Sequence, residues 1–553
     1  MSAAASTVAE VVAATLAERG VRQVFGVVGS GNFHVTNALI GSGARYVAAR
    51  HEMGATVMAD AYARMSDGIG VVTLHQGCGL TNAVTGLAEA AKSGTPLLAL
   101  AAEVTNPASN FYVDQPALAR AVGAESIRVD DPARAAAQIA AAYDLAVSGR
   151  RTVLVNLPLQ IQSRPVPSIA TDAGQPQPAT VAAPPDGEGV AELAGLLLGA
   201  QRPVFVAGRG ARHARTEIER AADEYGALLA TSAVVKGLFH GSPWSLDVSG
   251  GFATPLAANL IRDADLIVGW GCALNMWTMR HGRLIGPGTT VVQVDVDRGA
   301  LGRHRDIDLG IHGDSAEVAR CVRALFDGAA RAGYRSDEVA TRIAAEGRWR
   351  DVPYLDWAAG TGDSARIDPR TLTIGLDDLL PAERIVSVDS GNFMGYPSMF
   401  LSVPDELGFC FTQAFQSIGL GLATAIGAAL ARPDRLPVAA LGDGGALMGI
   451  AELDTVRRLG LPMVVVVYND AAYGAEVHHF SGGQPLETVT FPDTDIASIA
   501  RGYGFDAVTV RGIDDLGPVG NWLRGPRERA LLIDAKVAGP RGAWWLEEAF
   551  RGH

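Results

Sequence analysis

The chain has 553 residues, of which 48% are hydrophobic and 19% charged, and its formal net charge is −13. This length predicts two to four domains with ample core, and the negative charge argues against nucleic acid or an anionic membrane as a partner. No apolar run reaches the length of a membrane span. The first 20 residues predict an amphipathic helix with Glu10 and Glu18, unlike a secretory signal with its basic start. Four widely separated cysteines fit reduced thiols, so we expect a cytoplasmic location.

The first block, residues 1–163, alternates short apolar segments with helical runs, as a doubly wound parallel sheet does. The expected strands are 23–28, 45–50, 70–74, 97–101 and 152–157. His51 and Glu52 follow the second of these strands and precede a helical run over 54–64. His75 follows the third and opens a glycine-rich turn.

Residues 163–190 are rich in Pro, Ala and Asp and predict an extended linker. The second block, 190–330, has expected strands at 203–208, 266–269 and 290–296. A polar stretch at 334–368 leads to the third block, 365–553, which looks like the architecture of the first block used again. We therefore predict an α/β chain of three doubly wound parallel-sheet domains.

The third block carries an acidic glycine motif, Gly442-Asp443-Gly444, and further along Asn469-Asp470. The elements expected around them are strands at 385–388, 436–441 and 463–468 and a helix at 448–459. This βαβ order places Asp443 and Asp470 at the carboxyl ends of neighbouring parallel strands, where open α/β sheets bind ligands. Two carboxylates beside glycines suit Mg²⁺ carrying a diphosphate. Gly-Asp-Gly alone is also compatible with an ordinary acidic turn.

This unit resembles the diphosphate-binding motif of thiamine-diphosphate-dependent enzymes. The resemblance implies that Asp443 and Asp470 bind Mg²⁺ through their side chains and Ala472 through its carbonyl, although the family most often has Asn in place of Asp470. Residues 50–55 match the segment of the cofactor-activating glutamate, so Glu52 would hydrogen-bond N1′ of the aminopyrimidine and assist proton removal from C2. The resemblance covers essentially the whole chain and implies a pyrimidine-binding, a middle and a diphosphate-binding domain.

Residues 411–427 resemble the segment that folds under the cofactor. Ile418 would hold thiamine in its V shape, and the Gln416 carbonyl would accept from the 4′-amino group; an ordinary core role for Ile418 is the alternative. The complete set of implied cofactor-binding residues is Ser390, Gly391, Asn392, Gln416, Ile418, Gly442, Asp443, Gly444, Gly445, Asp470, Tyr473, Gly474 and Ala475. In this family the cofactor lies between two subunits, which implies a homodimer or, as a dimer of dimers, a homotetramer.

Three further residues distinguish the branches of the family. Gln115 matches the active-site glutamine of acetolactate synthases. His75 matches an active-site histidine of benzoylformate decarboxylases, and Glu476 a glutamate of pyruvate decarboxylases. A structural histidine and a solvent-facing glutamate on the first turn of a helix are the alternatives for the last two. The chain thus mixes carboligase and decarboxylase features.

The resemblance favours an acetolactate synthase-like carboligase, which decarboxylates a 2-oxo acid donor and transfers the acyl carbanion to an acceptor carbonyl. The alternative is a non-oxidative 2-oxo acid decarboxylase or aldehyde lyase. A non-catalytic relative is least favoured, because Glu52, Asp443 and Asp470 are all present. The glycine turns at 208–210 and 269–272 are weak nucleotide-binding signals, so a middle domain without nucleotide is favoured over one that holds FAD.

Overall fold

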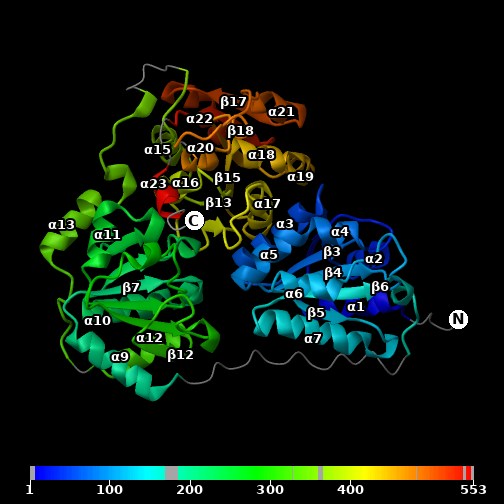
Figure 1. Ribbon diagram of the computed structural model, residues 1–553, viewed down its shortest axis with the longest axis horizontal. Helices are drawn as coiled ribbons and strands as arrows, with labels where there is room; N and C mark the ends of the chain where they lie inside the picture. Colours follow the sequence, from blue (N-terminus) through cyan, green and yellow to red (C-terminus); the bar gives the residue numbers. More distant parts are fainter. Residues whose placement is uncertain are drawn as a thin grey trace.

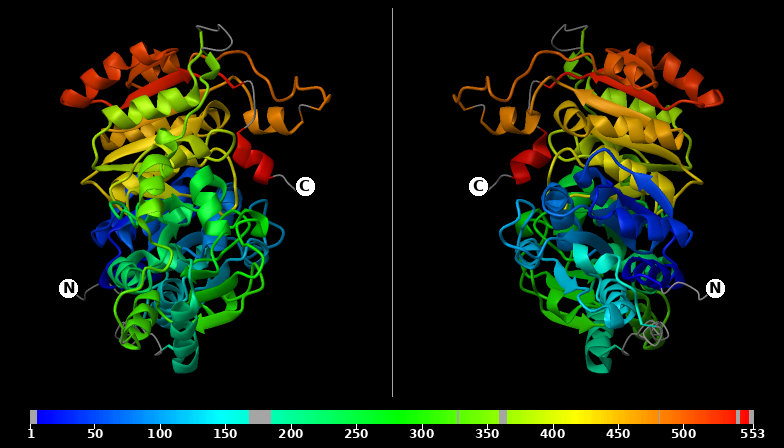
Figure 2. Two further views of the ribbon diagram at one scale, coloured as in Figure 1. Left: turned by 90° about the vertical axis from the view of Figure 1, so that its left-hand side faces the viewer. Right: turned by 90° about the vertical axis from the view of Figure 1, so that its right-hand side faces the viewer.

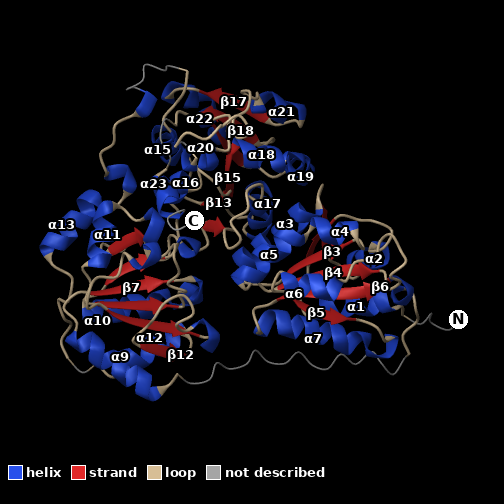
Figure 3. Cartoon of the chain, in the orientation of Figure 1, coloured by secondary structure: helices blue, strands red, loops and turns tan. Residues whose placement is uncertain are grey.

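The computed structural model describes residues 6–167, 185–326, 328–358, 365–480, 482–539 and 543–549. Three six-stranded parallel sheets, each with helices on both faces, lie at the corners of a triangle (Figures 1 and 3). The predicted α/β fold of three doubly wound parallel sheets is confirmed. The strands that were predicted end within two residues of the observed positions. Among the described helices, none is long and apolar enough to cross a membrane.

The first sheet has the strand order β2-β1-β3-β4-β6-β5. Its strands are β1 (Gln23–Gly26), β2 (Arg45–Ala48), β3 (Gly70–Leu74), β4 (Leu97–Glu103), β5 (Glu125–Arg128) and β6 (Thr152–Pro158). Its helices are α1 (Val8–Glu18), α2 (Phe33–Gly41), α3 (Glu52–Ser66), α4 (Cys78–Asn82), α5 (Val84–Ser93), α6 (Gln115–Ala121), α7 (Ala135–Ser148) and α8 (Leu159–Gln162). β2 is shorter than expected because His51 caps α3, its Nδ1 accepting from the Met53 amide at 3.2 Å. Glu52 therefore begins α3, at the end of the helix that favours a carboxylate.

The middle sheet has the order β12-β11-β10-β7-β8-β9. Its strands are β7 (Pro203–Ala207), β8 (Leu228–Thr231), β9 (Ser245–Val248), β10 (Leu266–Trp270), β11 (Thr290–Asp295) and β12 (Leu309–His312). Its helices are α9 (Gly187–Gly199), α10 (Arg215–Tyr225), α11 (Pro255–Arg262) and α12 (Ser315–Ala324). Most of the predicted linker, residues 168–184, lies outside the described residues, and α9 already begins within its expected end. The polar stretch after this domain contains α13 (Asp337–Glu346).

The third sheet has the order β14-β13-β15-β16-β18-β17, which repeats the first sheet position by position. Its strands are β13 (Arg384–Val388), β14 (Phe409–Phe411), β15 (Leu436–Gly442), β16 (Val464–Asn469), β17 (Asp506–Val510) and β18 (Leu531–Lys536). Its helices are α15 (Pro369–Leu379), α16 (Gly395–Phe400), α17 (Gly421–Ala431), α18 (Asp443–Met448), α19 (Leu453–Leu459), α20 (Gly474–His479), α21 (Ile496–Gly502), α22 (Gly517–Arg524) and α23 (Trp544–Ala549). The prediction that one architecture is used twice is confirmed.

The helix expected at 448–459 is wrong at its start. Helix α18 already begins at Asp443, and Gly449 separates it from a short 3-10 turn and then α19. Gly442 precedes α18 in an extended conformation, and Asp443 sits in the first helical turn, where a negative charge is favourable. The motif is thus a helix start and not only a turn.

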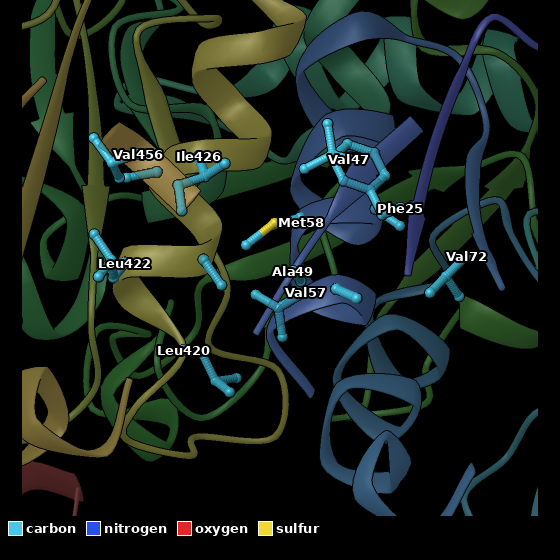
Figure 4. Close-up of a cluster of buried hydrophobic side chains, with 14 of the residues drawn as sticks. Phe25, Val47, Ala49, Val57, Met58, Val72, Leu420, Leu422, Ile426 and Val456 are labelled. Carbon is cyan, nitrogen blue, oxygen red and sulfur yellow. The ribbon is translucent and has the colours of Figure 1, made fainter. Parts of the chain in front are cut away.

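Helices α3 and α17 join the first and third domains. One buried cluster contains side chains from both, and Figure 4 shows Met58 extending from α3 toward Ile426 of α17. The helices approach so closely that a Cβ added to Gly427 would lie 2.2 Å from the Met58 carbonyl oxygen. At another edge of the molecule, α20 lies beside α23 (Figure 2).

Candidate active site

Loops at the carboxyl ends of β13, β15 and β16 meet around a set of glycines. A Cβ added to Gly474 would lie 2.5 Å from Asp470 Oδ2 and 2.9 Å from Asn392 Nδ2. A Cβ on Gly444 would lie 2.5 Å from Tyr473 Cε1. Larger side chains would therefore fill the space between these loops. The structure brings the predicted residues of all three loops together.

Asp443 and Asp470 are neighbouring buried carboxylates at this point. Burial raises the pKa of both groups, and the charge of Asp443 raises that of Asp470 further. The Ala472 amide donates toward both carboxylates and opposes these shifts. Asp470 Oδ1 is buried without a hydrogen-bond partner in the part of the chain that the structure describes. A desolvated carboxylate pair with an orphaned oxygen fits a hard divalent cation.

The described residues contain no group of three or more His, Cys, Asp and Glu side chains able to hold a metal. Mg²⁺ does not need such a cage, because it takes one or two carboxylates together with phosphate oxygens. A Cβ added to Gly442, which precedes Asp443, would meet only Phe393 Cδ2, at 3.8 Å, so a diphosphate can approach the backbone there. The residues present therefore fit a Mg²⁺–diphosphate group.

The loop between β14 and α17 carries Gln416 and Ile418. Gln416 has a left-handed backbone, with φ +61°. Ile418 is only partly buried, which argues against an ordinary core role, and its Cγ2 would lie 3.5 Å from a Cβ on Gly391. This contact places Ile418 against the loop that follows β13.

Asp389, which the sequence did not single out, holds the end of this loop. Its carboxylate accepts from the amides of Gly419 at 2.9 Å, Leu420 at 3.2 Å and Gly421 at 3.3 Å. Burial raises the pKa of Asp389 to about 6, although these amides oppose the shift. We call residues 390–392, 416–418, 442–445 and 470–475 the second half-site.

A first half-site forms at the carboxyl ends of the first sheet's strands, from Glu52, His75, Asn82 and Gln115. Glu52 Oε2 accepts from Asn82 Nδ2 at 3.0 Å. A Cβ on Gly79 would lie 3.3 Å from Glu52 Oε1 and 2.8 Å from His75 Cβ, so Glu52 and His75 are close neighbours. The sequence did not single out Asn82, although it lies in the same glycine-rich segment as His75.

His75 is partly buried and held as a neutral ring. Its Nδ1 accepts from the Gly31 amide at 3.2 Å, which leaves the ring proton on Nε2. Burial lowers the pKa of His75, and the charge of Glu52 only partly opposes this shift. His75 is therefore uncharged at neutral pH and presents a donor.

Gln115 begins α6 and is buried. Its Nε2 donates to the Ala102 carbonyl at 2.7 Å, while its Oε1 has no partner among the described residues. Glu476 lies apart from the first half-site, on α20 next to the second. It is half-buried, and its carboxylate has no hydrogen-bond partner within the described ranges.

Three models of the family match the chain. The thiamine pyrophosphate enzyme N-terminal TPP binding domain matches residues 6–122, the central domain 190–322 and the C-terminal TPP binding domain 389–535. The chain belongs to the thiamine pyrophosphate enzyme family. Thiamine pyrophosphate is the same compound as thiamine diphosphate, so the predicted cofactor and enzyme class, which forms or cleaves C–C bonds, are confirmed.

Relatives of this thiamine pyrophosphate enzyme have differing activities. A sulfoacetaldehyde acetyltransferase of Alcaligenes xylosoxydans xylosoxydans is 29% identical over 550 residues, covering 93% of this chain and 89% of the relative. A probable acetolactate synthase large subunit of Methanocaldococcus jannaschii is 25% identical over 541 residues, covering 92% and 88%. A probable 2-ketoarginine decarboxylase of Pseudomonas aeruginosa is 28% identical over 515 residues, covering 91% and 89%. The chain is thus similar both to acyl-transferring enzymes and to a decarboxylase.

In this thiamine pyrophosphate enzyme the two half-sites carry exposed apolar side chains. Beside the first half-site, Phe33 is 52% and Phe111 45% exposed; beside the second, Phe415 is 45% and Met448 53% exposed. Within the described residues, no side chain of the second half-site hydrogen-bonds to Glu52. Exposed apolar side chains therefore border both half-sites.

Proposed function

We propose that this enzyme removes CO₂ from a 2-oxo acid and transfers the remaining acyl unit to an acceptor carbonyl, as acetolactate synthases do. Asp443 and Asp470, with the Ala472 carbonyl, would hold Mg²⁺, and the second half-site would hold the diphosphate. When bound, thiamine diphosphate supplies the electron sink that makes loss of CO₂ feasible. The remaining chemistry belongs to the side chains of the first half-site.

With the cofactor bound, Glu52 would hydrogen-bond N1′ of the aminopyrimidine and could exchange a proton there. Asn82 occupies Glu52 Oε2, which leaves Oε1 for the cofactor. Because α3 begins at Glu52, the backbone of this residue is held at a helix end, and the Asn82 hydrogen bond orients its carboxylate. Gln115 and His75 then orient the donor and the acceptor through neutral hydrogen bonds.

The protonation state of His75 is the observation that favours ligation over simple decarboxylation. A simple decarboxylase must deliver a proton to its product, and a general acid is most effective with a pKa near the working pH. His75 is neutral, accepts the Gly31 amide on Nδ1 and has a lowered pKa, so it orients a carbonyl better than it supplies a proton. Transfer of the acyl unit to an acceptor carbonyl is therefore the favoured outcome. The acyltransferase and synthase relatives support the same choice.

We place each active site between two chains, in a homodimer that pairs further into a tetramer. The Glu52 surface of one chain would face the Asp443 surface of another, and this contact would cover Phe111, Phe415 and Met448. Exposed apolar borders on both half-sites support this arrangement.

A non-oxidative decarboxylase is the second candidate. Glu476 favours it, because its half-buried carboxylate has no hydrogen-bond partner among the described residues and lies beside the second half-site, where it is available for proton transfer. The similarity to a probable 2-ketoarginine decarboxylase points the same way.

Product analysis separates the two candidates. The purified enzyme, with Mg²⁺ and thiamine diphosphate, is given a panel of 2-oxo acids with and without aldehyde, sulfoacetaldehyde or 2-oxo acid acceptors, and the products are identified by mass spectrometry. An acyloin or a 2-hydroxy-2-acyl acid that depends on the acceptor supports ligation. Free aldehyde as the sole product with every acceptor would establish the decarboxylase instead.

We also propose that the middle domain works without FAD. Its two glycine turns bond to each other: the Gly208 amide donates to the Trp270 carbonyl at 2.9 Å, and the Gly210 amide to the Gly271 carbonyl at 3.0 Å. A Cβ on Gly208 would lie 2.3 Å from the Gly271 oxygen, so the turns leave no gap between them. The backbone amides of Gly208 and Gly210, which could otherwise bind a pyrophosphate, already donate to carbonyls of the other turn. Flavin fluorescence released from the purified protein by heat would contradict this proposal.

A further inference from the structure

The loop that carries Gln416 and Ile418 is held at both ends by buried carboxylates. Asp389 of the third domain binds the amides at its end, as described above. At its start, the carboxylate comes from the first domain instead. It belongs to Glu89 on α5, more than 300 residues away in the chain.

Glu89 has no exposed surface, and it accepts two backbone amides of the loop. Its Oε1 accepts from the Ala414 amide at 3.0 Å, and its Oε2 from the Phe415 amide at 2.6 Å. On the same helix, Lys92 Nζ lies 5.4 Å from the centre of the Phe415 ring. The residues immediately before Gln416 are therefore bound to α5, although the loop itself is exposed.

Arg64 connects this contact to α3. Its Nη2 donates to Glu89 Oε1 at 2.9 Å, and its Nη1 donates to the Phe411 carbonyl at 2.9 Å. It also donates to Asp60 within α3, at 2.7 and 2.9 Å, and to Ser93 Oγ on α5 at 2.6 Å. Arg64 and Glu89 thus fix the loop from Phe411 to Phe415 against the helix that begins with Glu52.

The backbone of Gln416 explains why such an anchor is needed. A left-handed conformation is unfavourable for a residue with a side chain and persists only where the surroundings impose it. Glu89 fixes the two amides before Gln416, and Asp389 fixes three amides starting at Gly419. The strained residue and Ile418 lie between the two anchors.

We propose that Glu89 is a positioning residue of the cofactor site, which sets the conformation of Gln416 and Ile418 through the loop amides. The inference rests on the proposed function, because it takes these two residues to contact thiamine diphosphate. Its consequence is that docking of the first domain onto the third domain of the same chain shapes the second half-site. A cofactor-binding conformation is then a property of the assembled domains and not of the third domain alone.

Glu89→Gln tests this role, because the amide keeps one acceptor and turns an N–H group toward the other loop amide. We expect faster amide hydrogen exchange in residues 411–421, by roughly 10- to 100-fold, as for the loss of a hydrogen bond to a charged group. Thiamine diphosphate binding, measured by calorimetry with Mg²⁺ and no substrate, should weaken by roughly 10-fold or more.

Glu452→Gln is the matched control. Glu452 is also a buried carboxylate at the contact of the first and third domains, and it accepts the Arg50 and His51 amides at 3.0 and 3.1 Å. Among the described residues, its carboxylate accepts hydrogen bonds from Arg50, His51 and Thr455 and from none of the loop, so this variant should lower the Tm while loop exchange stays at the wild-type rate. Equal loop exchange in both variants would overturn the inference, because general loosening of the domains would then explain it.

Glu89→Asp provides a second test if the glutamine variant does not fold. It keeps the charge that pairs with Arg64 but is one methylene too short to reach both amides. Wild-type loop exchange and wild-type cofactor affinity in this variant would also overturn the inference. Failure of the proposed function would look different: the wild-type protein itself would yield no acyl-transfer product, while the binding and exchange results would stand.

Discussion

Gly474→Ala is the sharpest test of the second half-site. The new Cβ would lie 2.5 Å from Asp470 Oδ2, so this oxygen must move by about 1 Å to reach an ordinary contact of about 3.4 Å. Because the atom that moves is at the end of a side chain, we expect a small cost in folding, about 1 kcal/mol, at the low end for overpacked sites. A misplacement of about 1 Å at an active site costs up to roughly 10²-fold in turnover.

The assay is a titration of Mg²⁺ and thiamine diphosphate, followed by calorimetry and by the rate of the substrate reaction. Gly482→Ala is the matched control, because nothing lies within 4 Å of the added Cβ there. We expect Gly474→Ala to unfold at nearly the wild-type temperature, to bind the cofactor weakly and to recover partly at high Mg²⁺, while the control behaves as wild type. Wild-type cofactor affinity in Gly474→Ala would refute the placement of Asp470 at the metal.

Four further predictions follow from the half-sites. Glu52→Gln should keep cofactor binding and lose roughly 10²–10⁴-fold in turnover, and hydrogen–deuterium exchange at thiamine C2 at the wild-type rate would contradict its role. His75→Ala should change product yield in an acceptor-dependent way, whereas a uniform loss of aldehyde release would favour the decarboxylase. The raised pKa of Asp389, about 6 when folded, means that its contribution to the free energy of unfolding falls as pH rises from about 4 to 6. Denaturant titrations should show a smaller fall over this range in Asp389→Asn than in the wild type, because Asp443 and Asp470, whose pKa values are also raised, contribute to the fall in both proteins. Sedimentation should show a dimer or tetramer, and a fully active monomer would exclude a shared site.

The sequence predicted the features that depend on residues close to one another in the chain. Most of the buried strands of the three sheets came from apolar runs, and the part of the second half-site around Asp443 and Asp470 came from one βαβ unit. The edge strands β5, β9, β12, β14 and β17 were not predicted, because they are short and several are only partly buried. The internal strands β8 and β18 were also missed, although both are fully buried. The glycines around Asp443 concealed the start of α18, since glycine propensity predicts a turn and tertiary packing overrides it.

The side chains that support the site were harder to find. Asn82 contacts Glu52 across 30 residues, and Glu89 contacts Phe415 across 326. Neither contact leaves a periodic pattern in a single sequence, because each depends on how α3, α4 and α5 pack. Buried carboxylates such as Glu89 and Asp389 give one sequence signal at most, which is an acidic residue inside an otherwise apolar segment.

The repeated strand order has a consequence for how this chain arose. Helix α3 follows β2 and helix α17 follows β14, which occupy equivalent edges of their sheets, and these two helices pack against each other. Two copies of one unit therefore face each other within a chain much as the subunits of a twofold-symmetric dimer do. A duplication followed by specialisation of the two copies accounts for this arrangement. At the carboxyl ends of its strands, one copy presents Glu52 and His75 for proton handling, and the other presents Asp443 and Asp470 for an anion and its cation; His75 and Asp443 follow the equivalent strands β3 and β15.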